Sequence, residues 1–505
     1  MKKYIFIILL STLVISCTNE LDQVNPNAMV KDQFWKTESD VLSAMASGYK
    51  SFRAPYNGYW GYKGVQLING RGDDFQIRND DKNMYALSTF NNTPTTGTPS
   101  GLFTGAYAGI FKANQIIENT PNADMDEALK AQYIAEAKFL RALNYFHLVI
   151  NFKDVPIITK VPTTRSEYFV KQSPEADVWA LIIKDFQEAK AKLPASYPAK
   201  WAGRATQGAA IGFLGKSFVY QKKWAEAEAE FKLLAKPDGQ PQAPHNFDLM
   251  TNFADNFTVA KDNNKEILFA CINQQVGGTD SYSQDNANEA QGSVTAQALA
   301  PAEVGGWFQL HVTNKAYNEF QKEKTTDGNV DPRMYASIVW NDTTMFYTKP
   351  YKTFAKVFDK IAKIKKYQNW TKINEEPKVT DIDEKELRFA DILLMFAETE
   401  TMLNKTSEAY PFVNRIRTRA KLAELPAGYS PDQMMAEIRH QRMIEFLREG
   451  LRFYDLRRWG LLEQEIANSD KEGKQFFNLT KNAYFPIPQG ELDTNPNIEQ
   501  NSAWK

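Results

Sequence analysis

Apolar residues recur at intervals of three and four along much of this chain, and that periodicity limits the fold more than any other feature. An α-helix repeats about every 3.6 residues, so such positions fall on one helical face. The clearest stretch, residues 126–152, has its apolar stripe at Leu129, Tyr133, Ala137, Leu140, Leu143 and Phe146. Similar patterns cover residues 174–193, 206–220, 224–235, 386–403, 408–422 and 432–451. The sequence therefore predicts a mostly α-helical protein.

Two pairs of these stretches also have the spacing of a repeated helix pair. Gly215, Ala227 and Phe231 reproduce small and aromatic positions of a tetratricopeptide repeat, and Ala397 and Ala409 stand at the same twelve-residue interval. Small residues let the two helices of a pair approach closely, and aromatic rings fill the space beside them. This spacing favours a tetratricopeptide-like α-α superhelix over a simple helix bundle.

Long irregular stretches separate the helical ones. Residues 91–100 and 237–245 are rich in turn-forming residues, and residues 274–306 are rich in Gln, Asn, Gly and Ala without a sustained period. Loops of this length are usually functional or disordered. We expect a helical scaffold over about 32–240 and 386–505, with an irregular ligand-binding insertion at about 241–385 that contributes a few short strands.

The amino terminus has the pattern of a secretion signal. Lys2 and Lys3 precede a short apolar run, residues 4–15, which is too short for a spanning helix and typical of a signal peptide. Ser16 and Cys17 follow, as in a bacterial lipobox. We predict a lipoprotein signal peptide at residues 1–16, acylation of Cys17 and a flexible tether at 17–31. The alternative is an ordinary signal peptide with a chance cysteine.

The composition argues against several functions. A net charge of −1 gives the chain no overall positive charge with which to attract nucleic acid. The four histidines, His147, His245, His311 and His440, are scattered and have no cysteine partners, so we expect no metal site and no cofactor. The chain has no G-x-S-x-G motif of a serine hydrolase. A glycosidase pair of carboxylates from distant positions stays open, although no motif supports one.

Charged clusters and the second cysteine are predicted to be structural. The acidic and basic side chains of residues 442–458 should form a scaffold network near a helix end: Arg442, Glu445, Glu449, Arg452, Asp455, Arg457 and Arg458. The lysines at 360, 363, 365, 366 and 372 are typical of a solvated helix face. Cys271 lies in an apolar, strand-like segment and should be buried.

A series of short motifs in a fixed order resembles the SusD/RagB family over nearly the whole mature chain. The motifs are Cys17 after a signal, Phe34-Trp35, Asn114, residues 135–146 (AEAKFLRALNYF) with Asp154-Val155-Pro156, Arg204-Ala205-Thr206, residues 394–398 (LMFAE), 414–420 (NRIRTRA), 442–459 (RMIEFLREGLRFYDLRRW) and 484–488 (YFPIP), with Asn495-Pro496 and Gln500-Asn501. Each motif is weak alone, but the ordered set is specific.

This resemblance implies a fold and a function. Members of that family are lipid-anchored proteins on the outer membrane of Bacteroidetes-type bacteria. They are not enzymes; they bind oligosaccharides, or peptides in some branches, and form a lid on a SusC-like TonB-dependent transporter. Their fold is a single domain of four tetratricopeptide-like helix pairs with irregular segments that hold the ligand. We therefore expect glycan capture and import at the cell exterior; the alternatives are peptide capture of the RagB type and a surface glycoside hydrolase.

The resemblance also suggests where the ligand binds. Trp307 is the position most similar to a family stacking tryptophan, although a loop aromatic that plugs the scaffold would look the same. The other expected segment contains Asp74, Phe75, Tyr85 and Asn91. Tyr282 and Trp340 are further candidates, whereas Trp224 lies at a repeat turn and should be structural.

Overall fold

The computed structural model describes residues 34–52, 61, 64, 69–274, 292–307, 309–340, 344–354, 362–375 and 379–505. The predicted signal peptide (1–16), Cys17, the tether (17–31) and Tyr282 lie outside the described residues. Within them the protein is mostly helical, with small sheets, as predicted.

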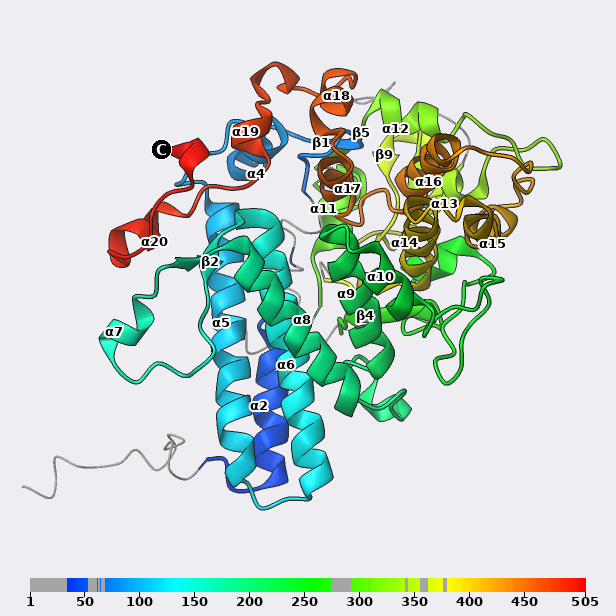
Figure 1. Cartoon of the computed structure of the whole chain (residues 1–505). Coiled ribbons are helices and arrows are strands. Elements are labelled where there is room, and N and C mark those ends of the chain that lie inside the picture. Colours follow the sequence, from blue (N-terminus) through cyan, green and yellow to red (C-terminus); the bar gives the residue numbers. More distant parts are fainter. Residues whose placement is uncertain are drawn as a thin grey trace, which may run out of the picture.

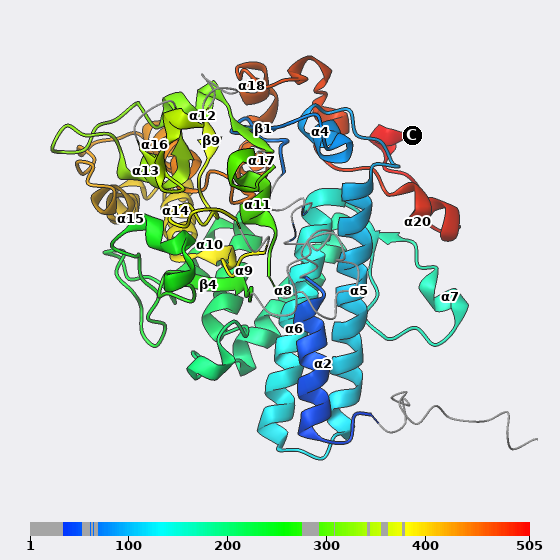
Figure 2. The same cartoon turned by 180° about the vertical axis from the view of Figure 1, so that it is seen from behind.

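The scaffold consists of four successive helix pairs and one further long helix. The pairs are α2 (Glu38–Lys50) with α5 (Gly97–Asn119), α6 (Glu127–Phe152) with α8 (Glu175–Lys192), α9 (Gln207–Tyr220) with α10 (Trp224–Phe231), and α14 (Phe389–Met402) with α15 (Thr406–Arg419); α16 (Pro431–Glu445) follows. Figures 1 and 2 show α2, α5 and α6 side by side at one end of the molecule, with α15 and α16 at the other. The tetratricopeptide-like fold class is confirmed.

Local sequence signals explain where the helices begin. Helix α6 begins after Asp126, whose side chain accepts a hydrogen bond from the backbone N–H of Leu129 (3.0 Å). Thr206 caps α9 in the same way, through the N–H of Ala209 (3.1 Å). Such caps satisfy donors that have no partner inside the helix. The predicted helices at 126–152, 174–193 and 206–220 are therefore confirmed to within a residue or two.

Aromatic side chains hold consecutive pairs together in one continuous core. The rings of Phe186 and Phe213 stack with centroids 5.6 Å apart, and Phe139 meets Phe213 at 5.7 Å and Phe269 at 5.0 Å. These contacts join α6, α8 and α9 to β4 (Ile267–Cys271). Much of the high aromatic content, which includes 32 Phe and 22 Tyr, is thus used in scaffold packing.

Short helices and strands connect and extend the pairs. The short helices are α4 (Lys82–Ser88), α7 (Arg165–Tyr168), α11 (Thr295–Leu299), α12 (Asn314–Glu319), α13 (Pro332–Ser337), α17 (Arg452–Arg458), α18 (Leu462–Ala467), α19 (Leu479–Asn482) and α20 (Gln489–Thr494). The strands are β1 (Phe75–Ile77), β2 (Val155–Pro156), β3 (Gln172–Ser173), β4, β5 (Leu310–Val312), β6 (Ile338–Val339), β7 (Met345–Phe346), β8 (Lys349–Pro350), β9 (Lys363–Ile364) and β10 (Glu384–Arg388). They form sheets of order β1-β5-β9-β6, β10-β4, β2-β3 and β7-β8.

Four predicted helices have different bounds in the structure. The helix predicted at 224–235 ends at Phe231, and the one predicted at 408–422 runs from Thr406 to Arg419. The prediction for 386–403 was wrong at its start, because Glu384–Arg388 pairs with β4 as an antiparallel strand and the helix begins at Phe389. The prediction for 432–451 was too long, because α16 ends at Glu445 and Arg448 and Gly450 adopt positive φ angles. Cys271 lies on β4 and is buried, as predicted.

The three central lysines of the lysine-rich segment do not lie on a solvated helix face, whereas Lys372 is exposed and Lys360 lies outside the described residues. Lys363 is on strand β9, and the side chains of Lys363, Lys365 and Lys366 are 4% exposed or less. Lys366 donates to the Glu449 carboxylate (3.0 Å), and the Lys365 ammonium lies 3.9 Å from the centroid of the Trp370 ring. The segment thus contributes strand β9 to the sheet, and through Lys366 it contacts the charged network near the end of α16. A count of charges along the sequence reveals neither contact.

Candidate functional site

One small sheet brings the two predicted ligand segments together. Strand β1, from the first third of the chain, pairs antiparallel with β5, so that Phe75 lies opposite Val312 and Ile77 opposite Leu310. On the other side of β5, β9 pairs with β6, which leads into Trp340. The segments that carry Asp74, Phe75, Trp307 and Trp340 therefore share one sheet, although more than 200 residues separate β1 from β5 in the sequence.

Trp307 lies beside this sheet with its side chain half-buried. Its backbone N–H donates to the carbonyl of Gln297 (2.9 Å), and its carbonyl accepts from the Arg78 guanidinium (3.0 Å). The preceding Gly306 passes so close to Ala300 that a Cβ atom would stand 2.0 Å from the Ala300 oxygen. Only glycine fits there, so the backbone position of Trp307 is fixed from both sides.

Polar groups suited to sugar hydroxyls surround the backbone of Trp307. The Arg78 guanidinium lies 3.4 Å from the Asp80 carboxylate, and the Gln309 amide donates to the same carboxylate (3.1 Å). The Arg78 and Asp80 side chains are 33% and 43% exposed. They are available to a ligand, and sequence reasoning missed both because neither belongs to a recognisable motif.

Trp340 belongs to a separate aromatic cluster. Its ring centroid lies 5.3 Å from that of Tyr335 on α13 and 6.2 Å from that of Tyr317 on α12. Tyr335 is 42% exposed, and Trp340 and Tyr317 are partly buried against the core. The cluster offers a second surface on which a flat ring could stack.

Asp74 and Phe75 have buried side chains, 3% and 2% exposed. The Asp74 carbonyl accepts from the N–H of Thr313 (3.1 Å), which ties β1 to the end of β5. Burial and the neighbouring Asp73 carboxylate raise the pKa of Asp74 to about 7. This placement argues against direct contact between either side chain and a ligand; both instead hold the sheet.

Tyr85 and Asn91 lie on and just after α4. The Tyr85 hydroxyl donates to the Glu472 carboxylate, and Asn91 is exposed, with its amide 3.2 Å from the Thr89 carbonyl. Both remain candidates for ligand contact. Trp224, which we predicted to be structural, packs partly buried against the core at the first turn of α10.

The charged residues near the end of α16 form an internal network. Glu445 contacts the guanidinium groups of Arg333 (3.3 Å), Arg388 (3.1 Å) and Arg419, and Arg388 also contacts Glu449 (2.8 Å). Arg442 bridges Asp391 and Asp455, both at 2.7 Å. These side chains are buried, as the structural interpretation predicted, and their charges are neutralised within the scaffold.

His311 and Lys363 face each other across β5 and β9. Burial, together with the nearby Lys363 and Arg78, lowers the pKa of His311 to about 3. Burial and Arg78 lower the pKa of Lys363 to about 6. At neutral pH both groups are therefore largely uncharged, and the sheet beneath Trp307 adds little charge to the site.

The described residues provide neither a metal site nor a membrane-spanning helix. In the described part of the chain, no three His, Cys, Asp or Glu side chains come together in a way that could hold a metal ion. Among the same residues, no helix has the length and apolar character that crossing a bilayer requires.

A pocket of about 640 Å³ lies elsewhere, between residues 153–174 and 479–504, and contains none of the predicted site residues. Sequence reasoning missed it because its walls come from segments more than 300 residues apart.

Comparisons with known proteins match nearly the whole chain. A family model described as "SusD family" matches residues 265–504, and one described as "Starch-binding associating with outer membrane" matches residues 20–219. SusD-like protein P2 of Formosa agariphila is 28% identical and is aligned over 99% of both chains. Among solved structures, a SusD superfamily protein from Bacteroides vulgatus has a TM-score of 0.85 and 32% identity, over 93% of this chain and 100% of that one. A laminarin-binding SusD-like protein has a TM-score of 0.78 and 25% identity, over 92% and 99%.

Proposed function

This chain belongs to the SusD family, and we propose that it captures oligosaccharides at the outer surface of the outer membrane and delivers them to a SusC-like TonB-dependent transporter. The similar laminarin-binding structure is named as a binding protein and not as an enzyme, which supports a role without catalysis. The laminarin-binding neighbour supports a glycan as the ligand class.

The observation that carries the proposal is the position of Trp307. The ring is half-buried beside the sheet that joins the two expected ligand segments, and exposed polar groups of Arg78 and Asp80 lie next to its backbone. A sugar ring presents C–H groups on its faces and hydroxyl groups around its edge. A rigid aromatic side chain can cover a face at low entropic cost, while charged and amide groups bind the hydroxyls.

The expected affinity is modest. Two or three stacking contacts contribute on the order of 1 kcal/mol each, and ordering the ligand offsets part of that gain, which places the Kd between millimolar and micromolar. Weak binding suits a protein that must release its ligand to a transporter. A lipid on Cys17 and docking on the transporter would keep the local concentration high.

Affinity gel electrophoresis tests the proposal. The protein is run through gels that contain laminarin or another candidate polysaccharide, alongside Trp307→Ala and Tyr168→Ala. Tyr168 is a matched control because its aromatic side chain is 51% exposed on the distant helix α7. We expect at least one polysaccharide to retard the wild type and Tyr168→Ala but not Trp307→Ala. Equal retardation of all three proteins would contradict the assignment of Trp307.

Two further measurements separate the alternatives. New reducing ends after incubation with the retained polysaccharide would indicate a hydrolase. Calorimetric titration with an oligopeptide library beside oligosaccharides would identify a peptide-binding protein of the RagB type. We expect heat of binding from the oligosaccharides and no new reducing ends.

A further inference from the structure

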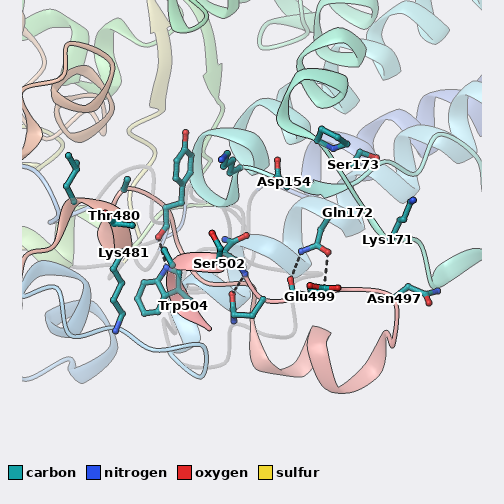
Figure 3. A pocket seen from close by; sticks show the side chains of 18 residues that line it. Asp154, Lys171, Gln172, Ser173, Thr480, Lys481, Asn497, Glu499, Ser502 and Trp504 are labelled. Carbon is teal, nitrogen blue, oxygen red and sulfur yellow. Dashed lines mark hydrogen bonds between the residues drawn. The ribbon is translucent and has the colours of Figure 1, made fainter.

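The pocket at the carboxyl-terminal segment has the features of a second binding site. Its walls are the loop after α6, strand β3 with the residues beside it, and residues 479–504 (Figure 3). Its volume of about 640 Å³ lies within the usual range for ligand pockets, roughly 300–1,000 Å³. The pocket contains no residue of the sheet beside Trp307, so it is separate from the candidate site at Trp307.

Hydrogen bonds across the chain hold the pocket wall in place. The Trp504 indole N–H donates to the carbonyl of Tyr484 (3.1 Å), and the Asn501 amide donates to the carbonyl of Phe485 (2.8 Å). The backbone N–H of Glu499 donates to the Gln172 side chain (3.0 Å). The final residues of the chain are thus fixed to the body, and Trp504 presents a half-buried ring to the pocket.

The cations of this pocket are not neutralised by the protein. Lys153, Lys171 and Lys481 line it and are exposed, and no carboxylate in the described residues forms an ion pair with any of them. Of the two acidic side chains of the lining, Glu499 pairs with Lys505 (2.6 Å), whereas Asp154 accepts from the N–H at the start of α8 (2.8 Å) and keeps its own negative charge. Three lysines therefore stand against one unpaired carboxylate. The pocket therefore has an excess of positive charge.

One of the cations lies close to the aromatic ring. The Lys481 ammonium stands 4.5 Å from the centroid of the Trp504 ring, and Figure 3 shows both at one end of the pocket, with Lys171 and Asn497 at the other.

Lys153 adopts φ +69° and ψ −95°, a strained backbone conformation for a residue with a side chain. Strain of this kind concentrates at functional sites, and here it lies on the pocket wall.

Two other pockets in the described part of the chain differ in this respect. In the larger pocket of about 830 Å³, Arg415 and Lys265 both pair with Asp248, at 2.5 Å and 2.8 Å. In the smaller one of about 190 Å³, Arg204 is bound to the Glu136 carboxylate, with the Arg204 Nε 2.9 Å from one oxygen. The cations named in these two pockets pair with carboxylates of the fold, although Lys421, which also lines the larger one, forms no ion pair within the described residues. The lysines of the carboxyl-terminal pocket are exposed and have no such pair.

We propose that this pocket binds an anionic unit of an oligosaccharide, with a sugar ring near Trp504 and its carboxylate or sulfate group on the lysines. Carboxylates and sulfates share the charge and acceptor oxygens that ammonium groups recognise. Hydroxyl and amide side chains in the lining, among them Thr480, Ser502 and Asn497, can bond the sugar hydroxyls. The site would let the protein distinguish acidic from neutral glycans, independently of stacking at Trp307.

Calorimetric titration with matched probes tests this site. Trigalacturonate carries carboxylates, a sulfated galactan tetrasaccharide carries sulfates, and galactotriose is the neutral counterpart. We expect one anionic probe, whose identity shows which group is preferred, to bind about tenfold or more tightly than galactotriose. Its affinity should fall about fivefold or more between roughly 20 mM and roughly 200 mM NaCl, because salt screens exposed charges.

Variants locate the binding. Lys481→Ala and Trp504→Ala should each weaken binding of the anionic probe about threefold or more, and combined substitution of Lys153, Lys171 and Lys481 by Ala should abolish it. The same three positions changed to Arg should restore it. Lys200→Ala is the matched control, since Lys200 also lies over a tryptophan, 5.4 Å from the Trp201 ring.

The site is independent of the proposed function at Trp307, and the test separates them. Trp307→Ala should leave binding of the anionic probe unchanged. Three outcomes would overturn the second site: no heat from either anionic probe, equal affinity for galactotriose, or loss of binding in Trp307→Ala with no effect of the lysine substitutions. Loss of polysaccharide retention in Trp307→Ala gels has no bearing on it.

Discussion

The ring of Phe231 on α10 occupies the space that a side chain at Gly215 on α9 would need. A Cβ atom at Gly215 would stand 2.4 Å from the Cε1 atom of Phe231, well inside van der Waals contact. Phe231 is fully buried, and its ring also lies 5.8 Å from that of Phe396 on α14. The absence of a side chain at Gly215 thus allows α9 and α10 to approach closely. Phe231, which fills the space beside Gly215, also connects this pair to the next pair, α14 and α15, through its contact with Phe396.

Gly215→Ala should lower the free energy of unfolding by about 1–3 kcal/mol, because the added methyl group overpacks the interface. Gly101→Ala is the matched control: Gly101 is on α5, and a Cβ there would meet nothing within 4 Å. That substitution should raise stability by about 0.5–1 kcal/mol through the better helix propensity of alanine. Denaturant unfolding of both variants measures the difference, and equal effects would contradict the close approach.

Glu445→Ala should be among the most destabilising substitutions in the scaffold. Burial alone would raise the pKa of Glu445, but the guanidinium groups of Arg419, Arg388 and Arg333 outweigh it and hold the pKa well below its usual range. Removing the carboxylate leaves buried cations without their partner, which costs about 3–5 kcal/mol.

An exposed ion pair is the control for Glu445. Glu499 pairs with Lys505 at the surface, and Glu499→Ala should leave the free energy of unfolding nearly unchanged, because water screens an exposed ion pair. Chemical denaturation compares the two variants. If Glu445→Ala were as mild as Glu499→Ala, the buried network would not contribute to stability as described.

His440 should make stability depend on pH between 6 and 9. Burial alone would lower the pKa of His440, but a hydrogen bond with Glu319 (2.7 Å) and an ion pair with Glu323 (3.3 Å) raise it to about 8. A raised pKa means that the stabilisation is complete below the unfolded value of about 6.5 and is lost as pH rises through 8. The difference between this pKa and the unfolded value corresponds to about 2 kcal/mol in the free energy of unfolding.

His440→Gln isolates this contribution. At pH 6 the variant should unfold with a free energy about 2 kcal/mol lower than the wild type, and the difference should shrink as the pH approaches 9. Urea unfolding at several pH values measures it. A difference that stays constant across this range would show that the histidine acts through packing and not through its charge.

Trp340→Ala tests whether the aromatic cluster of α12 and α13 takes part in glycan binding. If Trp340 and Tyr335 form a second stacking surface, each substitution by Ala should cost on the order of 1 kcal/mol, or about a fivefold loss of affinity. Calorimetry with the oligosaccharide that the gels identify measures it, with Tyr168→Ala as the control. Unchanged affinity in both variants would restrict the site to Trp307 and its neighbours.

Most long helices could be predicted from the sequence, but α5 could not. Its 23 residues begin in a Thr/Pro/Gly-rich stretch and include Gly97, Gly101, Gly105 and Gly109, which lower helix propensity. The helix forms because its apolar face, with Leu102, Phe103 and Ile110, is buried in the core. Tertiary packing overrides a weak local preference.

The candidate site was predictable only in part. The interest in Trp307, Trp340 and the segment around Asp74 came from family resemblance, and no sequence pattern indicated that Asp74 and Phe75 would be buried. Arg78 and Asp80 are typical surface residues in sequence, and only the pairing of β1 with β5 brings them to Trp307. Tyr282 lies outside the described residues, and its role stays a prediction.

The sequence by itself determined the elements whose signals are local. Apolar spacing, capping residues and the interval between Gly215 and Ala227 specify helices and their pairing, because they act over a few turns. Only the tertiary structure decided which strands meet, where Lys363 is buried and where the pocket at Trp504 lies. Those features join residues up to hundreds of positions apart, and the energy that holds them comes from burial and long-range hydrogen bonds that no local pattern records.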